Sequence, residues 1–201
     1  MKSKWFKARW FRVGRIRGIG ASLYVSRWVL AFVAALAALS WDDPLRAAIA
    51  VASYLAVIFV HEFGHAWMAR HLSYEVVSVR VGLIHGRCEF ESPHTEVDDV
   101  LIAWAGVLAQ LSIAIPVLII AAIFAGREPG YAGPVVSFLG NFNLMIALVN
   151  LVPGPGFDGA TAWRAIPLAY SWMKSRTIAR RTLKGIRGKR RTDSRGVTRI
   201  R

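Results

Sequence analysis

The chain has 201 residues, of which 55% are hydrophobic and 19% charged, and its formal net charge is +14. Soluble domains are usually about 45–50% apolar with glycine included, whereas here the apolar residues exceed that share and fall in blocks. The basic residues are just as segregated, because 19 of the 26 Lys and Arg lie in residues 1–17 and 174–201. A nearly uncharged core between basic tails excludes an ordinary soluble enzyme and indicates an integral membrane protein.

The single cysteine, Cys88, excludes a disulfide within the chain and a cysteine-based zinc site. We expect three regions. A membrane domain covers residues 23–173, between a basic, aromatic-rich N-terminal segment at 1–22 and a basic tail at 174–201.

Four apolar segments follow one another along the chain, and about 20 residues are needed to cross a bilayer. They are Leu23–Trp41, Leu45–Met68, Val100–Ala125 and Pro134–Val152. The first is the weakest, and a signal peptide is the alternative there, because Ala35-Leu36-Ala37 resembles a cleavage site. The pattern predicts an all-α polytopic membrane protein with about four transmembrane helices.

A polar stretch separates the second and third apolar segments. Val76–Val81 is rich in β-branched residues, and a second short run, Arg87–Glu91, follows it after a glycine-containing turn. This pattern predicts a short β-hairpin between the second and third membrane helices. After the fourth segment, residues 160–173 are expected to form one more short amphipathic or partly inserted helix.

The positive charges predict the orientation. The loops after the first and third apolar segments each carry one arginine balanced by acidic residues, whereas the opposite side collects both tails. We therefore expect both termini and the hairpin to be cytoplasmic. Aromatic residues interleave with basic ones near the N-terminus, which suits an interfacial helix: Trp5, Phe6, Trp10 and Phe11. Both tails are expected to contact anionic lipid headgroups, and nucleic-acid binding by the C-terminal run is a less favoured alternative.

The second apolar segment contains His61-Glu62-Phe63-Gly64-His65. Residues four apart share a face of a helix, so His61 and His65 can offer two imidazole nitrogens to one metal ion. Glu62 is then close enough to act as a general base on a metal-activated water. With 5 histidines in 201 residues, a chance occurrence of this spacing is rare. The alternative is a solvated helix end that binds no metal.

A zinc ion held by two histidines needs a third protein ligand and leaves its fourth position open. His71, His85 and His94 lie in or beside the hairpin region, and each could equally be an ordinary surface histidine. Asp158 lies in a stretch with two prolines and three glycines, which must interrupt the helix. Irregular backbone at membrane depth is tolerated where it is buried or lines a cavity. From the residues alone, Asp158 is either a metal ligand or a solvated turn residue.

The 61–65 motif, followed by Asn150, Pro153 and Asp158-Gly159 after the last apolar segment, resembles the site-2 protease family of intramembrane zinc metalloproteases. The resemblance extends from about Leu45 to Leu168. It implies that the two motif histidines and Asp158 bind one Zn²⁺, and that the motif glutamate activates the water. It also implies Asn150 as an oxyanion partner, with a packing or capping amide as the alternative. The expected substrate is a transmembrane protein.

The chain departs from the family pattern in one helix. Members often carry Gly-Pro-x-x-Asn after the hairpin, whereas this chain has Gly106-Val107-Leu108-Ala109-Gln110. Gln110 can still hydrogen-bond a substrate strand, and the hairpin at Glu75–Phe90 could pair with an extended substrate. The resemblance is to a minimal form without PDZ or CBS domains, so any regulatory input would come from a membrane partner.

Two other classes of protein stay open. One is a catalytically inactive relative that acts as a membrane scaffold or adaptor. The other is a different zinc protease with glutamate as the third ligand, which would need a glutamate-bearing helix after the motif. Only Glu128 follows the hairpin region, on the opposite side of the membrane.

Overall fold

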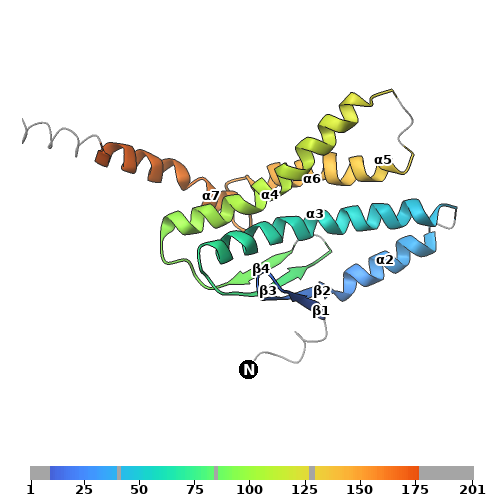
Figure 1. Ribbon diagram of the computed structural model, residues 1–201, viewed down its shortest axis with the longest axis horizontal. Coiled ribbons are helices and arrows are strands. Elements are labelled where there is room, and N and C mark those ends of the chain that lie inside the picture. Colours follow the sequence, from blue (N-terminus) through green and yellow to red (C-terminus); the bar gives the residue numbers. More distant parts are fainter. Residues whose placement is uncertain (1–9, 40–41, 84–85, 127–129, 177–201) are drawn as a thin grey trace, which may run out of the picture. The chain divides into compact units, whose positions relative to one another are not determined.

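The computed structural model describes residues 10–39, 42–83, 86–126 and 130–176 (Figure 1). The chain divides into two compact units, residues 1–163 and residues 164–201. In chain order the elements are β1 (Trp10–Ile16), β2 (Ala21–Ser26), α2 (Arg27–Leu39), α3 (Pro44–His71), β3 (Val76–Val81), β4 (Arg87–Phe90), α4 (Glu96–Ile123), α5 (Ala132–Val135), the π-helical segment η1 (Val136–Phe142), α6 (Asn143–Asn150) and α7 (Gly159–Ala162). The described part of the second unit is helical over residues 165–176.

Three helical stretches are long and apolar enough to cross a membrane: α3, α4 and the continuous stretch 132–150 formed by α5, η1 and α6. Local signals fix the start of two of them. Asp43 Oδ1 accepts a hydrogen bond from the Arg46 amide at 3.0 Å at the start of α3, and Thr95 Oγ1 accepts one from the Asp98 amide at 3.1 Å at the start of α4. Side-chain oxygens at this position satisfy amides that have no partner within the helix.

Helix α2 occupies most of the first predicted membrane segment. It has 13 residues, which at 1.5 Å per residue is about 20 Å, less than the roughly 30 Å of the hydrocarbon core. The first four residues of that predicted segment belong instead to strand β2. Three of the four predicted spans therefore have the required length among the described residues, and the count of four crossings stays a prediction.

The fold contains a four-stranded sheet in the order β1-β2-β3-β4, so it is mostly helical with a small sheet, not all-α. β3 and β4 form the antiparallel pair between α3 and α4. β1 and β2 form a second antiparallel pair, and β2 joins it to β3 in parallel. The interfacial helix expected near the N-terminus is wrong for Trp10 and Phe11, which lie in β1, while Trp5 and Phe6 lie outside the described residues.

The physical reason is a backbone partner that local sequence does not reveal. A strand needs a neighbour for its backbone N–H and C=O groups, and β3 offers a free edge to β2 more than 50 residues earlier in the chain. The expected boundary between residues 22 and 23 consequently falls inside β2. The expected start of the basic tail at residue 174 stays a prediction.

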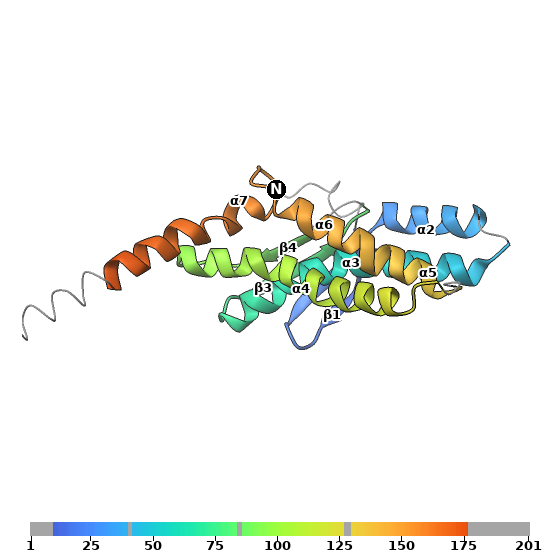
Figure 2. The same cartoon turned by 90° about the horizontal axis from the view of Figure 1, so that it is seen from above.

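One face of the sheet packs against the C-terminal half of α3. Its core includes Ala21, Ala66, Ala69, Val79 and Ile102, none of which is more than 2% exposed. Figures 1 and 2 show α3 running through this unit with the sheet along one side and α4 along another. Small alanines on α3 let the strands approach closely, so the sheet is fixed beside the part of α3 that carries residues 61–65.

One side of α4 carries exposed apolar side chains. Leu108, Ile115, Ile119 and Ile123 are between 49% and 71% exposed. Contiguous exposed aliphatic side chains are unfavourable in water and mark a surface that contacts lipid or protein. This stripe agrees with α4 as a membrane-spanning helix.

Candidate metal centre

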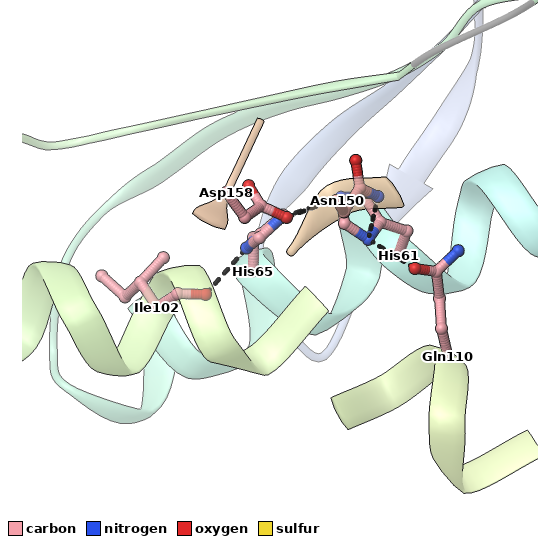
Figure 3. A network of polar contacts seen from close by, with 6 residues as sticks. All are labelled: His61, His65, Ile102, Gln110, Asn150 and Asp158. Atoms are coloured by element: carbon pink, nitrogen blue, oxygen red, sulfur yellow. Dashed lines mark hydrogen bonds and ion pairs between the residues drawn. The ribbon is translucent and has the colours of Figure 1, made fainter. Parts of the chain in front are cut away.

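Three ligand atoms from two distant parts of the chain converge at the centre of the first unit (Figure 3). The Nε2 atoms of His61 and His65 lie 3.1 Å apart, and Asp158 Oδ2 lies 3.1 Å from the first and 3.3 Å from the second. Ligands about 2.0–2.1 Å from a tetrahedral zinc ion are separated by roughly 3.3 Å. Among the described residues, these three form the group whose ligand atoms could hold one metal ion.

The outer nitrogens of the two rings determine what the inner nitrogens can do. His65 Nδ1 lies 2.7 Å from the carbonyl oxygen of Ile102, and His61 Nδ1 lies 3.1 Å from Gln110 Oε1. Because both oxygens only accept hydrogen bonds, each Nδ1 carries the proton and donates it. Each Nε2 then keeps a lone pair directed at Asp158, which is the arrangement of metal-bound histidines.

This arrangement is unfavourable without a cation. Two imidazole lone pairs and a carboxylate oxygen face one another within 3.3 Å. Asp158 Oδ2 is buried and, among the described residues, accepts no hydrogen bond despite these short distances. Buried polar atoms normally have a partner. The donor set therefore fits a zinc ion.

Two indoles anchor the loop that delivers Asp158. Trp163 Nε1 donates to the carbonyl oxygen of Leu151 at 2.6 Å, which ties the end of α7 to the end of α6. Trp104 Nε1, from α4, donates to the carbonyl oxygen of Ala162 at 3.0 Å. These bonds satisfy backbone groups where the helix is interrupted, and they hold the loop against α4.

Gly159 allows the same loop to fold back. A Cβ atom at this position would lie 2.4 Å from the carbonyl oxygens of both Leu151 and Val152. Since such contacts do not occur in proteins, any other residue at 159 would move Asp158 away from the histidines.

Glu62 lies beside the ligands on α3 and is only 6% exposed. Its carboxylate accepts a hydrogen bond from the backbone amide of Cys88 in β4. A cavity of about 730 Å³ opens here, lined by Glu62, the three candidate ligands, β4 residues and apolar side chains such as Ile58 and Phe157. The cavity therefore gives a substrate room beside both the ligands and the glutamate.

Asn150, the last residue of α6, lies against the His61 ring. Its Nδ2 atom is 3.4 Å from each ring nitrogen, beyond the usual hydrogen-bond range of about 2.7–3.2 Å, so the amide bonds neither nitrogen firmly. The side chain lines the cavity. Its expected role as an oxyanion partner stays a prediction.

The other histidines proposed as a third ligand do not join this group. His71 stacks on Trp67 at 5.4 Å between ring centroids, and His94 packs against the Tyr74 ring at 5.2 Å. His85 lies outside the described residues.

Sequence reasoning missed the residues that support the ligands: the Ile102 carbonyl, the two indoles, and the contact of Gln110 with His61. A usable signal existed for Ile102 and Gln110. Together with Gly106 they follow at intervals of four residues and so share one face of α4.

No protein-family model matches the chain. Two curated proteins are similar to part of it. The "Putative zinc metalloprotease sll0528" of Synechocystis is 30% identical over 112 residues, which is 55% of this chain and 29% of that protein. The "Putative zinc metalloprotease Rip3" of Mycobacterium tuberculosis is 32% identical over 125 residues, 60% of this chain and 30% of that protein. The matched region thus spans less than a third of either curated relative.

A solved structure covers more. The site-2 protease from Methanocaldococcus jannaschii superposes with a TM-score of 0.62 at 25% identity, over 88% of this chain and 81% of that one. Together with three helices able to span a membrane, this similarity supports an integral membrane protein. In both sequence and structure, the chain is thus similar to members of the site-2 protease family.

Proposed function

We propose that the chain is an intramembrane zinc metalloprotease that hydrolyses peptide bonds of membrane-embedded protein substrates. One observation carries the proposal. Two imidazole lone pairs and Glu62 lie on α3, a helix apolar enough to span a bilayer, and the Asp158 carboxylate converges on them from the loop after α6. Ionisable side chains are costly at such a place unless they serve a function.

Each residue has a definite task. When bound, zinc supplies a Lewis acid that polarises a carbonyl and acidifies a water molecule. His61 and His65 would hold it through Nε2, and Asp158 through Oδ2. The Glu62 carboxylate accepts a proton from the attacking water and later gives it to the leaving amine. The Asn150 amide, which lines the cavity, would donate to the substrate oxygen as negative charge develops there.

The substrate would lie along β4. This strand is at the edge of the sheet, its residues line the cavity, and the Cys88 amide points to Glu62. An extended segment of substrate can therefore pair with the free edge of β4 once its helix has locally unwound. A proline at Val79 does not test this pairing, since Val79 is fully buried in the interior strand β3 and the substitution would disrupt the sheet itself.

N-methylation of the substrate backbone tests the pairing better. Alternate amides of a paired strand point toward its neighbour, so methylation should slow cleavage at every second position and leave the positions between them unaffected. A response without this period of two would contradict strand pairing.

The metal site is tested by zinc content in detergent-purified protein. We expect about one zinc per chain in the parent and in Glu62→Gln, and markedly less in Asp158→Ala. Cleavage of a library of transmembrane-helix peptides, read by mass spectrometry, should fall about 10²-fold or more in Glu62→Gln, because the general base is lost.

The other outcomes are decisive as well. Full zinc retention in Asp158→Ala would remove Asp158 from the ligand set. Zinc in neither protein, even after zinc is supplied, would favour the inactive scaffold.

A further inference from the structure

Helix α4 meets the histidine pair along one line of positions. Ile102, Gly106 and Gln110 follow at intervals of four residues and so lie on one face of the helix. The first accepts the Nδ1 proton of His65 through its carbonyl, and the last faces His61 Nδ1. Each candidate ligand on α3 therefore has its own support on α4.

Gly106 sets the distance between this line and the rings. A Cβ atom at Gly106 would lie 2.5 Å from the Cε1 and Nε2 atoms of His65 and 2.9 Å from Cε1 of His61. The α4 backbone is thus in direct contact with the imidazoles. This close approach brings a side chain one turn further along, at position 110, within reach of His61.

Gln110 is held at this place from both sides. It is 0% exposed, and Asn143 Nδ2 donates to its backbone carbonyl oxygen at 3.0 Å, which ties α4 to the start of α6. Oε1 lies 3.1 Å from His61 Nδ1, while Nε2 is buried without a hydrogen-bond partner among the described residues. A glutamine that served only to fill the core would leave a donor unpaired at a cost and gain nothing.

We propose that Gln110 is a positioning residue of the metal centre: Oε1 accepts the Nδ1 proton of His61 and thereby keeps the Nε2 lone pair directed at the metal position. In the other tautomer, Nε2 carries the proton and cannot bind a metal ion. This inference rests on the zinc site of the proposed function, and it assigns the selection of the His61 tautomer to one side-chain oxygen.

Three substitutions at position 110 separate the roles of the side chain. Gln110→Glu keeps an accepting oxygen at the same reach, Gln110→Met keeps the length without that oxygen, and Gln110→Asn withdraws the oxygen by about 1.5 Å, one carbon–carbon bond. Ser112→Ala is the matched control, because Ser112 is exposed on the same helix and its hydroxyl donates to the Ala109 carbonyl, away from the metal centre.

Zinc affinity is measured by competition with a chelator, and the visible spectrum of the Co²⁺-substituted protein reports the ligand geometry. The histidine tautomers of the metal-free protein are read by ¹⁵N NMR, which the total of 5 histidines makes practicable. Loss of a hydrogen bond to a metal-bound histidine typically costs 10–100-fold in affinity. We expect a loss of this size in Gln110→Met and Gln110→Asn, with a shift of His61 toward the Nε2-protonated form. Gln110→Glu and Ser112→Ala should keep the affinity and tautomer of the parent.

Parent-like affinity and tautomer in Gln110→Met would overturn the proposal, and so would a loss in Gln110→Glu equal to that in Gln110→Met. If Gln110→Met does not fold, the contrast between the Glu and Asn variants decides. The proposed function fails separately: a parent that binds zinc through this network but cleaves no peptide would refute the protease and leave the role of Gln110 intact.

Discussion

At the scale of single residues, the position of Glu62, the proposed general base, is confined by Gly86. A Cβ atom at Gly86, just before β4, would lie 2.3 Å from Cγ of Glu62. Gly86→Ala should therefore displace Glu62, and a shift of about 1 Å in a reacting group can cost 10²-fold in rate. We expect cleavage by Gly86→Ala to fall about 10²-fold while its zinc content stays that of the parent. Both quantities are measured on the same preparation. Gly18→Ala is the control, because nothing lies within 4 Å of that position; equal cleavage by the Gly86 and Gly18 variants would show that Glu62 is not so confined.

A second residue-scale prediction concerns the single cysteine. Burial raises the pKa of the Cys88 thiol to about 12, with further contributions from the negative charges of Glu62 and Glu89. Only the thiolate reacts with alkylating agents, so at pH 8 the reactive fraction is about 10⁻⁴, compared with about 10⁻¹ for an ordinary thiol. Alkylation by iodoacetamide should be at least about 100-fold slower in the folded protein than in denaturant, and should accelerate as the pH rises toward 12. Mass spectrometry measures both rates, and a folded rate equal to the unfolded one would contradict the raised pKa of this partly buried thiol.

At the scale of elements, the sequence predicted the features that depend on residues close together in the chain. The expected spans Leu45–Met68 and Val100–Ala125 lie within a few residues of α3 and α4, because long apolar runs and helix caps are local signals. Strands β1 and β2 were missed because their place depends on pairing with β3, which follows a whole transmembrane helix later. The spacing of His61 and His65 is likewise local. The residues alone left Asp158 open between a metal ligand and a turn residue, and the family resemblance favoured the ligand. The contact of Gln110 with His61, 49 residues apart, was missed because it depends on how α4 packs against α3.

The loop after α6 supplies the prediction that belongs to this scale. Trp163→Phe removes the N–H that donates to the Leu151 carbonyl but keeps an aromatic ring beside Trp104, whose centroid lies 5.9 Å away. We expect a loss of about 1 kcal/mol in the free energy of unfolding, the usual contribution of one hydrogen bond. Zinc affinity should fall about 10-fold, because the loop that carries Asp158 is held less firmly.

Chelator competition measures the affinity of this variant, and denaturant titration in detergent measures its stability. Trp172→Phe is the control, since that indole belongs to the second unit. Unchanged zinc affinity in Trp163→Phe would mean that the backbone of the loop positions Asp158 without the indole.

At the scale of the whole molecule, the depth of the metal centre constrains how water reaches it. His61 precedes the end of α3 by ten residues, which corresponds to about 15 Å along the helix, or half the thickness of a hydrocarbon core. Hydrolysis at this depth needs a hydrated route. The cavity of about 730 Å³ lies beside the ligands and is bordered by the glycine- and proline-rich loop, so it is the candidate for that route. The same irregular loop thus brings the third ligand and leaves polar backbone beside the cavity.

The second unit bears on how the chain meets the surface of a membrane. Its helix at residues 165–176 exposes Ile166, Tyr170 and Trp172 by 57–65%, and the Arg176 guanidinium lies 4.1 Å from the Trp172 ring centroid. A 12-residue helix is marginal on its own in water. Apolar and aromatic side chains beside basic ones suit the interface of an anionic bilayer, where each Lys or Arg contributes about 1 kcal/mol. We infer that this helix lies on the surface of an anionic leaflet.

Trypsin cleavage in the C-terminal tail tests that inference on the full chain in lipid nanodiscs. Cleavage should be slower by several-fold in nanodiscs with anionic lipid than in neutral ones, and the protection should disappear at 1 M salt, where charges are screened within about 3 Å. Replacing Lys174 and Arg176 with glutamine should weaken the protection, whereas the same change at Arg46, which precedes the long apolar part of α3, should not. Equal cleavage in both lipids would contradict the contact with lipid, and protection by RNA or DNA in neutral nanodiscs would favour nucleic acid as the partner of the tail.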